Sequence, residues 1–304
     1  MTNDTKIGKG RSYEILEILN TDLSELPEHA VIAIDYAKDA IESAAIGKKD
    51  LNRFEQLNGS FDMDSIVEFS NAWSRWDNIF DSLKPPIVPL DQQLFEVKDE
   101  GDSEQYFDGI ADLAKKNREA VTAWIHEQEA SQYEHLLDVG AGRDFTYAES
   151  FVNTIAEKVT CMDMPTVVSL AKKTTGANIE WIPHNIDKPF PKSCTKEFDM
   201  VWISNVFHHY SIKACEKILF NIQPALQRNA EIFVQEYVID AEPKPQKLAA
   251  SMLGVHFAIT TNGGRCYTKD ELNEMLSTIT FKEDCSTAFL YSTVTKFVRG
   301  RNGK

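Results

Sequence analysis

Residues 135–144, HLLDVGAGRD, decide the fold of this chain. An apolar run leads through Asp138 into a turn that has glycine at positions 140 and 142. Such a run is typical of a buried parallel strand, and glycine lets the backbone of the turn approach a ligand closely. We therefore expect a nucleotide-type crevice at this turn, with Asp138, Gly140 and Gly142 among the cofactor contacts.

The residues downstream complete a mononucleotide-binding unit. Residues 146–157 suit a helix, and residues 158–163, KVTCMD, suit a second strand that ends in an acid. An acid about 20 residues beyond a glycine turn, at the carboxyl end of the next strand, is placed to accept hydrogen bonds from both ribose hydroxyls. Asp163 is that candidate.

The order Asp-x-Gly-x-Gly differs from the dinucleotide fingerprint, because the acid precedes the turn and no glycine stands at the last position. This order resembles the first motif of the Rossmann-like methyltransferases, which favours S-adenosylmethionine over NAD. Residues 163–168, DMPTVV, resemble the Asp-Leu-Pro-x-Val run of small-molecule O-methyltransferases similar to the caffeic acid and hydroxyindole O-methyltransferases. Another doubly wound α/β domain is the alternative for residues 135–168.

Length and charge limit the class of partner. With 304 residues, the chain can hold one large domain and a smaller one. Its net charge of -15 would repel a phosphate backbone or an anionic membrane surface, so we expect a small-molecule acceptor, no nucleic acid and no membrane partner. We find no window that approaches the length of a membrane span, and the polar N-terminus does not predict a signal peptide.

The cysteines indicate the compartment. The chain has five, without any Cys-x-x-Cys pair: Cys161, Cys194, Cys215, Cys266 and Cys285. This scatter predicts neither a metal site nor a disulfide framework. We expect a reducing compartment, the cytoplasm.

Residues 1–104 predict a smaller all-α domain. Residues 11–20 and 28–47 carry helical patterning, and residues 63–83 carry one apolar stripe made of Ile66, Phe69, Trp73, Trp76, Phe80 and Leu83. The stripe packs either on the chain's own core or in a dimer interface resembling that of plant and bacterial O-methyltransferases. The winged-helix part common in that family is shortened or missing here, so a homodimer is an expectation to be tested.

Residues 105–304 predict the catalytic domain. An amphipathic helix at 105–127 leads into it, and further strands and helices are expected to alternate, with strands at 179–183, 198–203 and 230–234 and helices at 165–174 and 211–228. This alternation predicts a mostly parallel sheet with helices on both faces, and ligands bind beyond the carboxyl ends of such strands. Residues 289–297 are expected to form the last strand, which is antiparallel in methyltransferases of this fold.

Several positions resemble cofactor contacts of the family. Asn185 matches the acid that receives the adenine amino group, since its side-chain carbonyl can accept the same bond, and Asp187 is the alternative. Met164 lies against the adenine ring or serves only in packing. Ser204 reaches the cofactor by its backbone or simply ends a strand. Asp144 stands where the family has a third small residue, and it either bonds the cofactor's methionine ammonium or crowds the site.

Residues 205–211, NVFHHYS, resemble the family's Leu-His-Asp-Trp-Ser/Asp. In that motif the histidine is the general base that takes the proton from the acceptor hydroxyl. An alcohol or phenol attacks a sulfonium methyl poorly until it loses its proton, and imidazole titrates near neutral pH. The resemblance places His208 at the catalytic position. His209 replaces the family's Asp and is interpreted as a supporting or surface residue, and Tyr210 replaces the Trp.

A base of this kind needs an orienting hydrogen bond. Glu236, at the end of the strand from 230, matches a Glu that flanks the histidine in similar enzymes. The family's second flanking Glu lies in Gly-Gly-Lys/Arg-Glu-Arg-Thr, and Cys266 replaces it in residues 263–268, GGRCYT. Residues 248–257 resemble the helix over the acceptor. The residues expected to line the substrate pocket, with packing in a helix core as the alternative for the first three, are Met252, His256, Phe257 and Cys266.

Together these patterns predict an α/β chain with a helical domain over residues 1–104 and a Rossmann-like S-adenosylmethionine-binding domain over residues 105–304. The expected reaction transfers a methyl group from S-adenosyl-L-methionine to a hydroxyl of a small molecule and leaves S-adenosyl-L-homocysteine, with His208 as general base. An N- or C-methyltransferase of the same family is one alternative, because it would need less base and tolerate Cys266. A protein that binds the cofactor without transferring methyl is the other.

Overall fold

We analysed a computed structural model, which describes residues 23, 24, 26–44, 115, 117–128, 132–143, 145–171, 178–240, 244–289 and 292–300. The predicted helices at 11–20 and 63–83 lie outside the described residues, and so do Asp144 and the side chain of Met252. The helix predicted at 28–47 is present as α2 (Glu28–Ala44), and residues 117–128 are helical as expected. The boundary at residue 104 between two domains stays a prediction.

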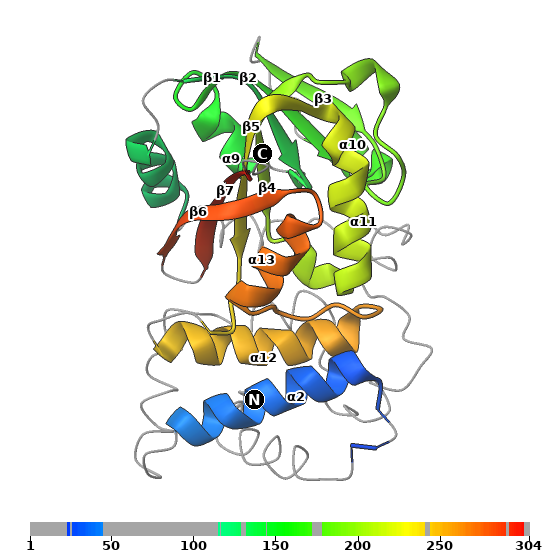
Figure 1. The fold of residues 1–304 in the computed structure, drawn as a ribbon, viewed down its shortest axis with the longest axis vertical. Helices are drawn as coiled ribbons and strands as arrows, with labels where there is room; N and C mark the ends of the chain where they lie inside the picture. The colour runs from blue at the N-terminus through cyan, green and yellow to red at the C-terminus, as the bar shows by residue number, and fades with distance from the viewer. Residues whose placement is uncertain are drawn as a thin grey trace, which may run out of the picture.

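A seven-stranded sheet in the order β3-β2-β1-β4-β5-β7-β6 lies in the upper half of Figure 1 and organises the described residues. Its strands are β1 (Tyr133–Val139), β2 (Ala156–Asp163), β3 (Ile179–Pro183), β4 (Phe198–Ser204), β5 (Leu226–Glu236), β6 (Phe281–Ala288) and β7 (Thr293–Arg299). Strands β1 to β5 run parallel, whereas β7 is antiparallel to both β5 and β6. The predicted α/β class, with a mostly parallel sheet and an antiparallel last strand, is confirmed.

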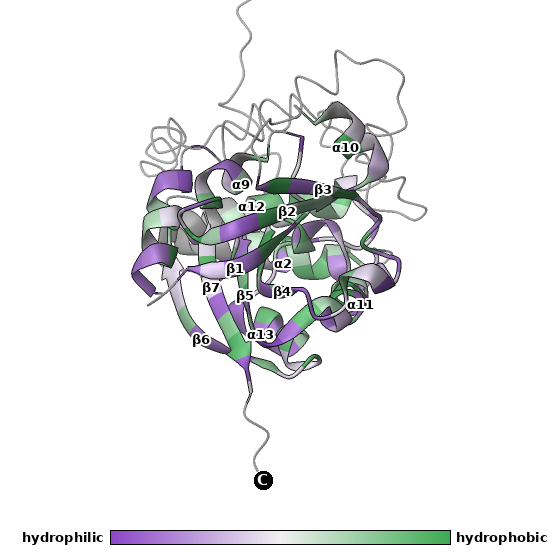
Figure 2. Ribbon diagram, turned by 90° about the horizontal axis from the view of Figure 1, so that it is seen from above, coloured by the Kyte–Doolittle hydropathy of each residue, from purple (hydrophilic) through white to green (hydrophobic). Residues whose placement is uncertain are grey.

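Helices cover both faces of this sheet. Successive side chains of a strand point to opposite faces, so Leu137 of β1 joins one hydrophobic core and Leu136 joins the other. The first core is closed by α11 (Ile212–Ile222) and α13 (Lys269–Ser277), and the second by α9 (Thr146–Phe151) and residues 117–128. Figure 2 shows α11 and α13 on one side of the sheet and α9 on the other.

Several predicted boundaries are wrong. The helix expected over 146–157 ends at Phe151, because Asn153 adopts a left-handed conformation with φ of 63° and β2 begins at Ala156. The helix expected over 211–228 ends at Ile222, because Pro224 in the short turn η3 (Gln223–Ala225) has no N–H with which to continue it. Strand β5 begins at Leu226, earlier than the expected residue 230, and ends at Glu236, which the sequence analysis placed at the end of this strand. The last strand begins at Thr293 rather than at 289, and the helix predicted at 165–174 is α10 (Pro165–Leu170).

Helix α12 (Lys244–Thr260) crosses the carboxyl ends of the parallel strands, and α2 lies along its outer side (Figure 1). The contact between the two helices uses small and branched apolar side chains: Ala30, Ala33, Ile34 and Ala37 of α2 meet Val255, Ala258 and Ile259 of α12. Small side chains allow two helices to pack closely. Thus α2, from the predicted front domain, supports the helix that covers the end of the sheet where ligands bind. Within the described part of the chain, we find no helix with both the length and the hydropathy of a membrane span.

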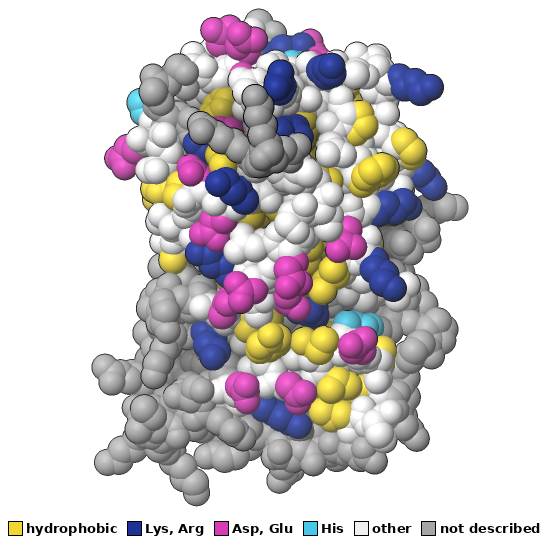
Figure 3. Space-filling view, in the orientation of Figure 1, with side chains coloured by type: hydrophobic (Ala, Val, Ile, Leu, Met, Phe, Trp, Pro, Cys, Tyr) yellow, Lys and Arg dark blue, Asp and Glu magenta, His cyan; other side chains and the backbone are white. Residues whose placement is uncertain are grey.

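Helix α13 begins at a capping box. The Thr268 hydroxyl accepts a hydrogen bond from the Glu271 amide at 3.2 Å, and the Glu271 carboxylate accepts one from the Thr268 amide at 2.9 Å. Asp270 and Glu271 in the first turn also face the positive end of the helix dipole, which stabilises the helix. Figure 3 draws one face of the molecule and shows acidic side chains gathered on it at the level of α13. The sequence analysis assigned no element to residues 269–288, which form α13 and β6.

Candidate functional site

The turn after β1 is held by backbone hydrogen bonds. The amide of Gly140 donates to the carbonyl of Met162 at 2.8 Å, and the amide of Gly142 donates to the carboxylate of Asp163 at 2.9 Å. Both glycines adopt positive φ, 71° and 70°. A Cβ at Gly140 would lie 2.7 Å from the side chain of Val206, whereas a Cβ at Gly142 would meet none of the described residues within 4 Å. The turn is therefore closed beside Val206 and open at Gly142, where a ligand can approach the backbone.

Asp163 ends β2 as predicted. Its carboxylate accepts hydrogen bonds from the amides of Gly142 at 2.9 Å and Met164 at 2.7 Å, one on each oxygen. Each oxygen keeps a second lone pair for a ligand donor. Burial raises the pKa of Asp163 to about 6, although the two backbone hydrogen bonds lower it, so the group is ionised at neutral pH. An acceptor pair of this kind suits the two hydroxyls of a ribose.

Asp138 lies deeper than the turn that it precedes. Its side chain is only 3 % exposed and sits in the sheet between Cys161 of β2 and Trp202 of β4. Burial, with a further contribution from the charge of Asp163, raises the pKa of Asp138 to about 8. The carboxyl group is therefore protonated at neutral pH. A direct cofactor contact of Asp138 stays a prediction.

The predicted adenine contacts lie at the ends of the neighbouring strands. The side-chain oxygen of Asn185, two residues beyond β3, accepts a hydrogen bond from the Asp187 amide at 2.8 Å, which turns the chain sharply. One lone pair of that oxygen is left for a ligand. Met164 is half-buried at the start of α10 and its amide is engaged by Asp163. The adenine roles of Asn185, Met164 and the alternative Asp187 remain predictions.

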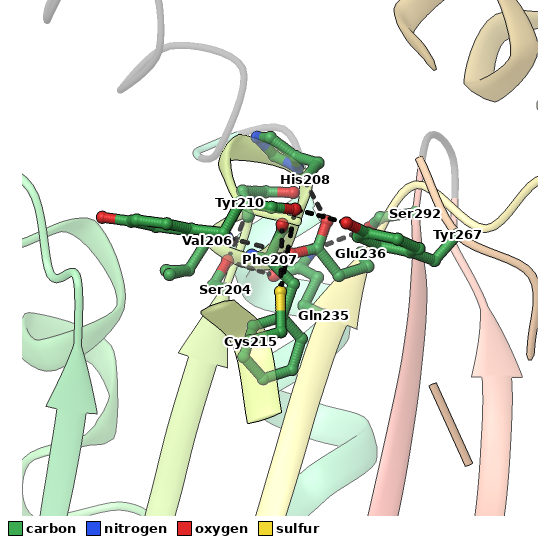
Figure 4. A network of polar contacts seen from close by, with 11 residues as sticks. Ser204, Val206, Phe207, His208, Tyr210, Cys215, Gln235, Glu236, Tyr267 and Ser292 are labelled. Carbon is green, nitrogen blue, oxygen red and sulfur yellow. Dashed lines mark hydrogen bonds and ion pairs between the residues drawn. The ribbon is translucent and has the colours of Figure 1, made fainter. Parts of the chain in front are cut away.

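Ser204 ends β4 and belongs to a chain of side-chain hydrogen bonds (Figure 4). Gln235 donates through Nε2 to the hydroxyl of Ser292 at 2.7 Å, and Ser204 donates to Oε1 of Gln235 at 3.0 Å. Asn205 then donates through Nδ2 to the hydroxyl of Ser204 at 3.3 Å. The other end of its amide, Oδ1, is buried and has no hydrogen-bond partner among the described residues. The sequence analysis missed Asn205, although its place directly after a predicted strand was visible.

The structure brings His208 and Glu236 together. His208 lies in η2 (Phe207–His209), a single turn that follows β4, and its Nδ1 is 2.7 Å from one carboxylate oxygen of Glu236. The other oxygen accepts hydrogen bonds from the amides of Val206 at 2.9 Å and Phe207 at 2.7 Å, and Figure 4 shows this cluster above the ends of β4 and β5. Because a carboxylate only accepts, Nδ1 carries the hydrogen and Nε2 is the basic nitrogen.

Aromatic side chains surround the imidazole of His208. Phe257 of α12 stacks on it with ring centroids 3.9 Å apart and an angle of 15° between the planes. Tyr237 lies at 5.7 Å from the same ring, and the buried His256 lies at 5.4 Å from Phe257. The predicted acceptor residues His256 and Phe257 are thus beside the predicted base.

His209 does not have the character of a surface residue. Its ring lies 4.4 Å from that of His208, and its Nδ1 is buried without a hydrogen-bond partner among the described residues. Burial lowers the pKa of His209 well below its usual value, and the nearby His208 and His256 lower it further. The imidazole is therefore neutral. The buried Nδ1 does not fit the surface interpretation of His209, and the supporting interpretation stays a prediction.

The loop that carries Cys266 closes over η2. A Cβ at Gly264 would lie 2.3 Å from the carbonyl oxygen of His208, so no larger residue fits without moving the backbone. Cys266 is buried in one apolar cluster with Tyr237 and Phe257. Burial, with the charge of Glu236, raises the pKa of the Cys266 thiol well above its usual value. A thiol in this state is a poor nucleophile. Cys266 packs in this cluster, and its predicted contact with the substrate stays a prediction.

Two further hydrogen bonds fix the turn that carries His208. The hydroxyl of Tyr267 donates to the carbonyl of Tyr210, and the thiol of Cys215 donates to the carbonyl of Phe207 at 3.4 Å (Figure 4). The sequence analysis did not assign either role. Within the ranges that the structure describes, no group of three or more His, Cys, Asp or Glu side chains is arranged to hold a metal ion.

Comparison of the sequence with known proteins shows which proteins the chain is similar to. A model of the O-methyltransferase domain matches residues 92–282. The chain is 25% identical to eugenol O-methyltransferase of Sorghum bicolor over 169 residues, which are 53% of this chain and 42% of that protein. It is 27% identical to O-methyltransferase 11 of Lophophora williamsii over 152 residues, 49% of this chain and 38% of that protein. The match thus spans less than half the length of these relatives.

Solved structures share the fold. Human N-acetylserotonin methyltransferase, solved with S-adenosylmethionine, has a TM-score of 0.63 and 19% identity, and the match covers 78% of this chain and 70% of that one. An O-methyltransferase from neocarzinostatin biosynthesis, solved with S-adenosyl-L-homocysteine and 1,4-dihydroxy-2-naphthoic acid, has a TM-score of 0.57 and 14% identity, with 82% and 70% covered. At these identities the likeness establishes the fold.

Proposed function

The chain belongs to the O-methyltransferase domain family, whose members use S-adenosylmethionine, and from this membership we propose that it transfers a methyl group from that cofactor to a hydroxyl of a small molecule. The observation that carries the proposal is the buried pair of His208 and Glu236, 2.7 Å apart, at the strand end next to the glycine turn. S-adenosyl-L-homocysteine is the second product.

The residues at the ends of β1 and β2 fit this cofactor. Asp163 offers two acceptor oxygens, and the open space at Gly142 lets a ligand reach the backbone. In the proposed complex, Asp163 holds the ribose hydroxyls and the glycine turn lies against the rest of the molecule. The bound cofactor supplies a methyl group on a sulfonium, which is activated toward a nucleophile without any contribution from the protein.

His208 acts as the general base in this proposal. Glu236 fixes Nδ1–H, so Nε2 takes the proton from the acceptor hydroxyl, and the carboxylate stabilises the imidazolium that forms. Phe257 stacks on the ring and excludes water from one of its faces. The remaining contribution of the protein is to hold the hydroxyl oxygen and the methyl group at attacking distance.

An N- or C-methyl acceptor is the second candidate. The observation in its favour is Cys266, whose buried neutral thiol stands where the family has a second carboxylate near the histidine. An amine that is already neutral, or an activated carbon, needs less help from a base than a hydroxyl does. A protein that binds the cofactor and transfers nothing is the third candidate.

Replacing His208 by Ala separates these candidates. Single-turnover transfer of labelled methyl is measured with eugenol and 1,4-dihydroxy-2-naphthoic acid as first acceptors, followed by a metabolite extract. We expect His208→Ala to bind S-adenosylmethionine as tightly as the parent in calorimetry and to transfer methyl roughly 10²–10⁴-fold more slowly, the usual contribution of a positioned general base. His126→Ala, at an exposed helical position, is the matched control and should keep the parent rate.

The other outcomes assign the alternatives. Equal single-turnover rates for the parent and His208→Ala would reject the base and favour the N- or C-methyl candidate. Cofactor binding without label transfer to anything in the extract would favour the third candidate. A parent protein that does not bind S-adenosylmethionine would reject the proposed function as a whole.

The proposal includes an assembly and a location. We propose a homodimer through the stripe at residues 63–83, which lies outside the described residues. Light scattering tests the proposal, because a Trp73→Gln, Trp76→Gln double variant should have a lower oligomer mass than the parent. A parent that is monomeric at all concentrations would reject the homodimer. The cytoplasm is the proposed location, because Cys161, Cys194, Cys215 and Cys266 are buried as free thiols. Fractionation of cells that express the chain tests that location.

A further inference from the structure

Asn205 presents a buried carbonyl oxygen that the described residues leave without a partner. Its Oδ1 is buried and accepts no hydrogen bond from the described residues. An unpartnered buried acceptor destabilises a protein by about 1–3 kcal/mol, so native structures keep one mainly where something else supplies the donor. The position, directly after β4 and three residues before His208, makes a bound ligand the natural donor.

The hydrogen-bond chain at the strand ends determines which end of the amide is presented. Gln235 donates to Ser292 and accepts from Ser204. Because the hydroxyl of Ser204 already donates its one hydrogen to Gln235, it can only accept a hydrogen bond from Asn205. Asn205 therefore turns its NH2 group toward Ser204 and leaves its oxygen for another donor. The site at Asn205 is an acceptor site.

The backbone holds this oxygen beside the glycine turn. Asn205 has φ of 57°, in the left-handed region that asparagine tolerates better than most residues, and its amide donates to the carbonyl of Gln235 at 2.9 Å. The next residue, Val206, fills the space beside Gly140, where a Cβ would approach it to 2.7 Å. Asn205 is thus fixed between the end of β4 and the turn after β1.

We infer that Oδ1 of Asn205 accepts a hydrogen bond from the ammonium group of the methionine part of bound S-adenosylmethionine, an inference that rests on the proposed function. The cofactor's sulfur carries the methyl group, the ribose carbon and the methionine chain. With the ribose at Asp163 and the methyl group turned toward His208, the sulfur would lie between these two residues. The methionine chain is short, so its ammonium would stay within reach of the ends of β1 and β4.

Two buried atoms near His208, Nδ1 of His209 and Oδ1 of Asn205, have no hydrogen-bond partner among the described residues, and their surroundings differ. The Nδ1 atom of His209 belongs to a ring packed 5.3 Å from Phe257, among the aromatic groups of α12. The side chain of Asn205 instead contacts the polar groups at the strand ends, through Ser204. An ammonium offers three donors and an amide oxygen offers two lone pairs, so the two groups are complementary.

Calorimetry with three probes tests the inference. The variant is Asn205→Gly, because glycine adopts φ of 57° without strain and removes only the side chain. We expect its affinity for S-adenosylmethionine and S-adenosylhomocysteine to fall roughly ten- to a hundredfold, as for the loss of a hydrogen bond to a charged group. Its affinity for methylthioadenosine, which lacks the amino acid part, should equal that of the parent. Asn205→Asp keeps an acceptor oxygen and should restore most of the affinity.

The remaining outcomes overturn the inference. Unchanged binding of S-adenosylhomocysteine by Asn205→Gly would show that water or another donor serves Oδ1, and an equal loss for methylthioadenosine would show a purely structural role. An analogue of S-adenosylhomocysteine without its amino group supplies a test on the parent protein alone: it should bind roughly ten- to a hundredfold more weakly than S-adenosylhomocysteine. Equal affinities there would also reject the inference, whereas a parent that binds none of the probes would reject the proposed function instead.

Discussion

The two sides of the candidate site are built in different ways. The cofactor side lies within residues 138–187, at the ends of three adjacent strands, and backbone amides make many of its hydrogen bonds. The acceptor side joins η2, the end of β5, α12 and the loop at 263–268, and one carboxylate, that of Glu236, receives three of its hydrogen bonds. The cofactor side spreads its hydrogen bonds over the Asp163 and Asn185 side chains and the carbonyl of Met162, so it tolerates the loss of one side chain better than a side assembled around one carboxylate does.

The largest effect is expected from Glu236→Ala, which breaks the acceptor side. The change leaves the amides of Val206 and Phe207 and the Nδ1–H of His208 buried without an acceptor. We expect the free energy of unfolding in urea to fall by about 3–5 kcal/mol, as when one partner of a buried pair is removed. Methyl transfer should also be lost, because His208 is no longer oriented.

Two variants control this experiment. Glu236→Gln keeps one acceptor oxygen, so it should cost less stability and less rate than the alanine. Glu119→Ala, at an exposed helical position, should leave the unfolding midpoint unchanged. If Glu236→Ala proved as stable as Glu119→Ala, the view that one carboxylate organises the acceptor side would be wrong.

A smaller effect is expected from Asp163→Ala on the cofactor side. The amides of Gly142 and Met164 that it frees lie at a partly exposed strand end, where water can replace the carboxylate. Stability should therefore fall less than for Glu236→Ala, while S-adenosylmethionine binding in calorimetry weakens by roughly 1.5–3 kcal/mol, as for hydrogen bonds to a charged group. Asp187→Ala is the comparison, since it tests the alternative adenine contact. Unchanged affinity in Asp163→Ala would remove the ribose assignment.

The most gradual effect, spread over several pH units, concerns Asp138. Because the pKa of Asp138 is raised to about 8 in the folded protein, the unfolded chain loses this proton at lower pH than the folded one does. The contribution of Asp138 to stability is therefore fully present in acid and is lost as pH rises from near 4 toward 8.

Asp138→Asn removes that dependence, since the amide does not titrate. Relative to Asp138→Asn, the parent should lose up to about 1.4 kcal/mol of unfolding free energy per pH unit in this window. Urea unfolding of both proteins between pH 4 and 9 measures the difference. If the unfolding free energies of the two proteins changed in parallel with pH, the Asp138 carboxyl would be ionised in the folded protein and would contact solvent or ligand directly.

Sequence reading placed the glycine turn and Asp163 correctly in the sheet for a physical reason, while their cofactor roles stay predictions. The glycine turn and Asp163 are about 20 residues apart in adjacent parallel strands, and local pattern is enough to place them. His208 and Glu236 were matched by resemblance, and the structure supplies the cause of their contact: β4 and β5 are parallel neighbours, so their carboxyl ends meet. The aromatic stack of Phe257 depends on the path of α12, which no local pattern specifies.

Of the two elements that the sequence analysis did not assign, α13 has a one-sided apolar pattern, Leu272, Met275 and Leu276, that was overlooked, whereas β6 has none. Strand β6 is at the edge of the sheet and only Phe281 in it is buried, so its sequence lacks the alternation of a half-buried strand. Asn205 escaped notice because a left-handed asparagine after a strand is also ordinary turn chemistry. Only the hydrogen-bond chain through Ser204 and Gln235 shows that its carbonyl has no partner in the described protein.

The position of β7 has a consequence for the order in which the chain assembles. Strand β7 lies between β5 and β6, so β6 is made before its neighbour in the sheet exists. Until residues 293–299 join, β6 has no strand to pair with and β5 exposes an open edge, which is a template for wrong pairing with another chain. During synthesis on the ribosome, the candidate base and its carboxylate therefore stand next to an unfinished sheet. A premature stop before Thr293 would remove one strand from the sequence but two from the sheet.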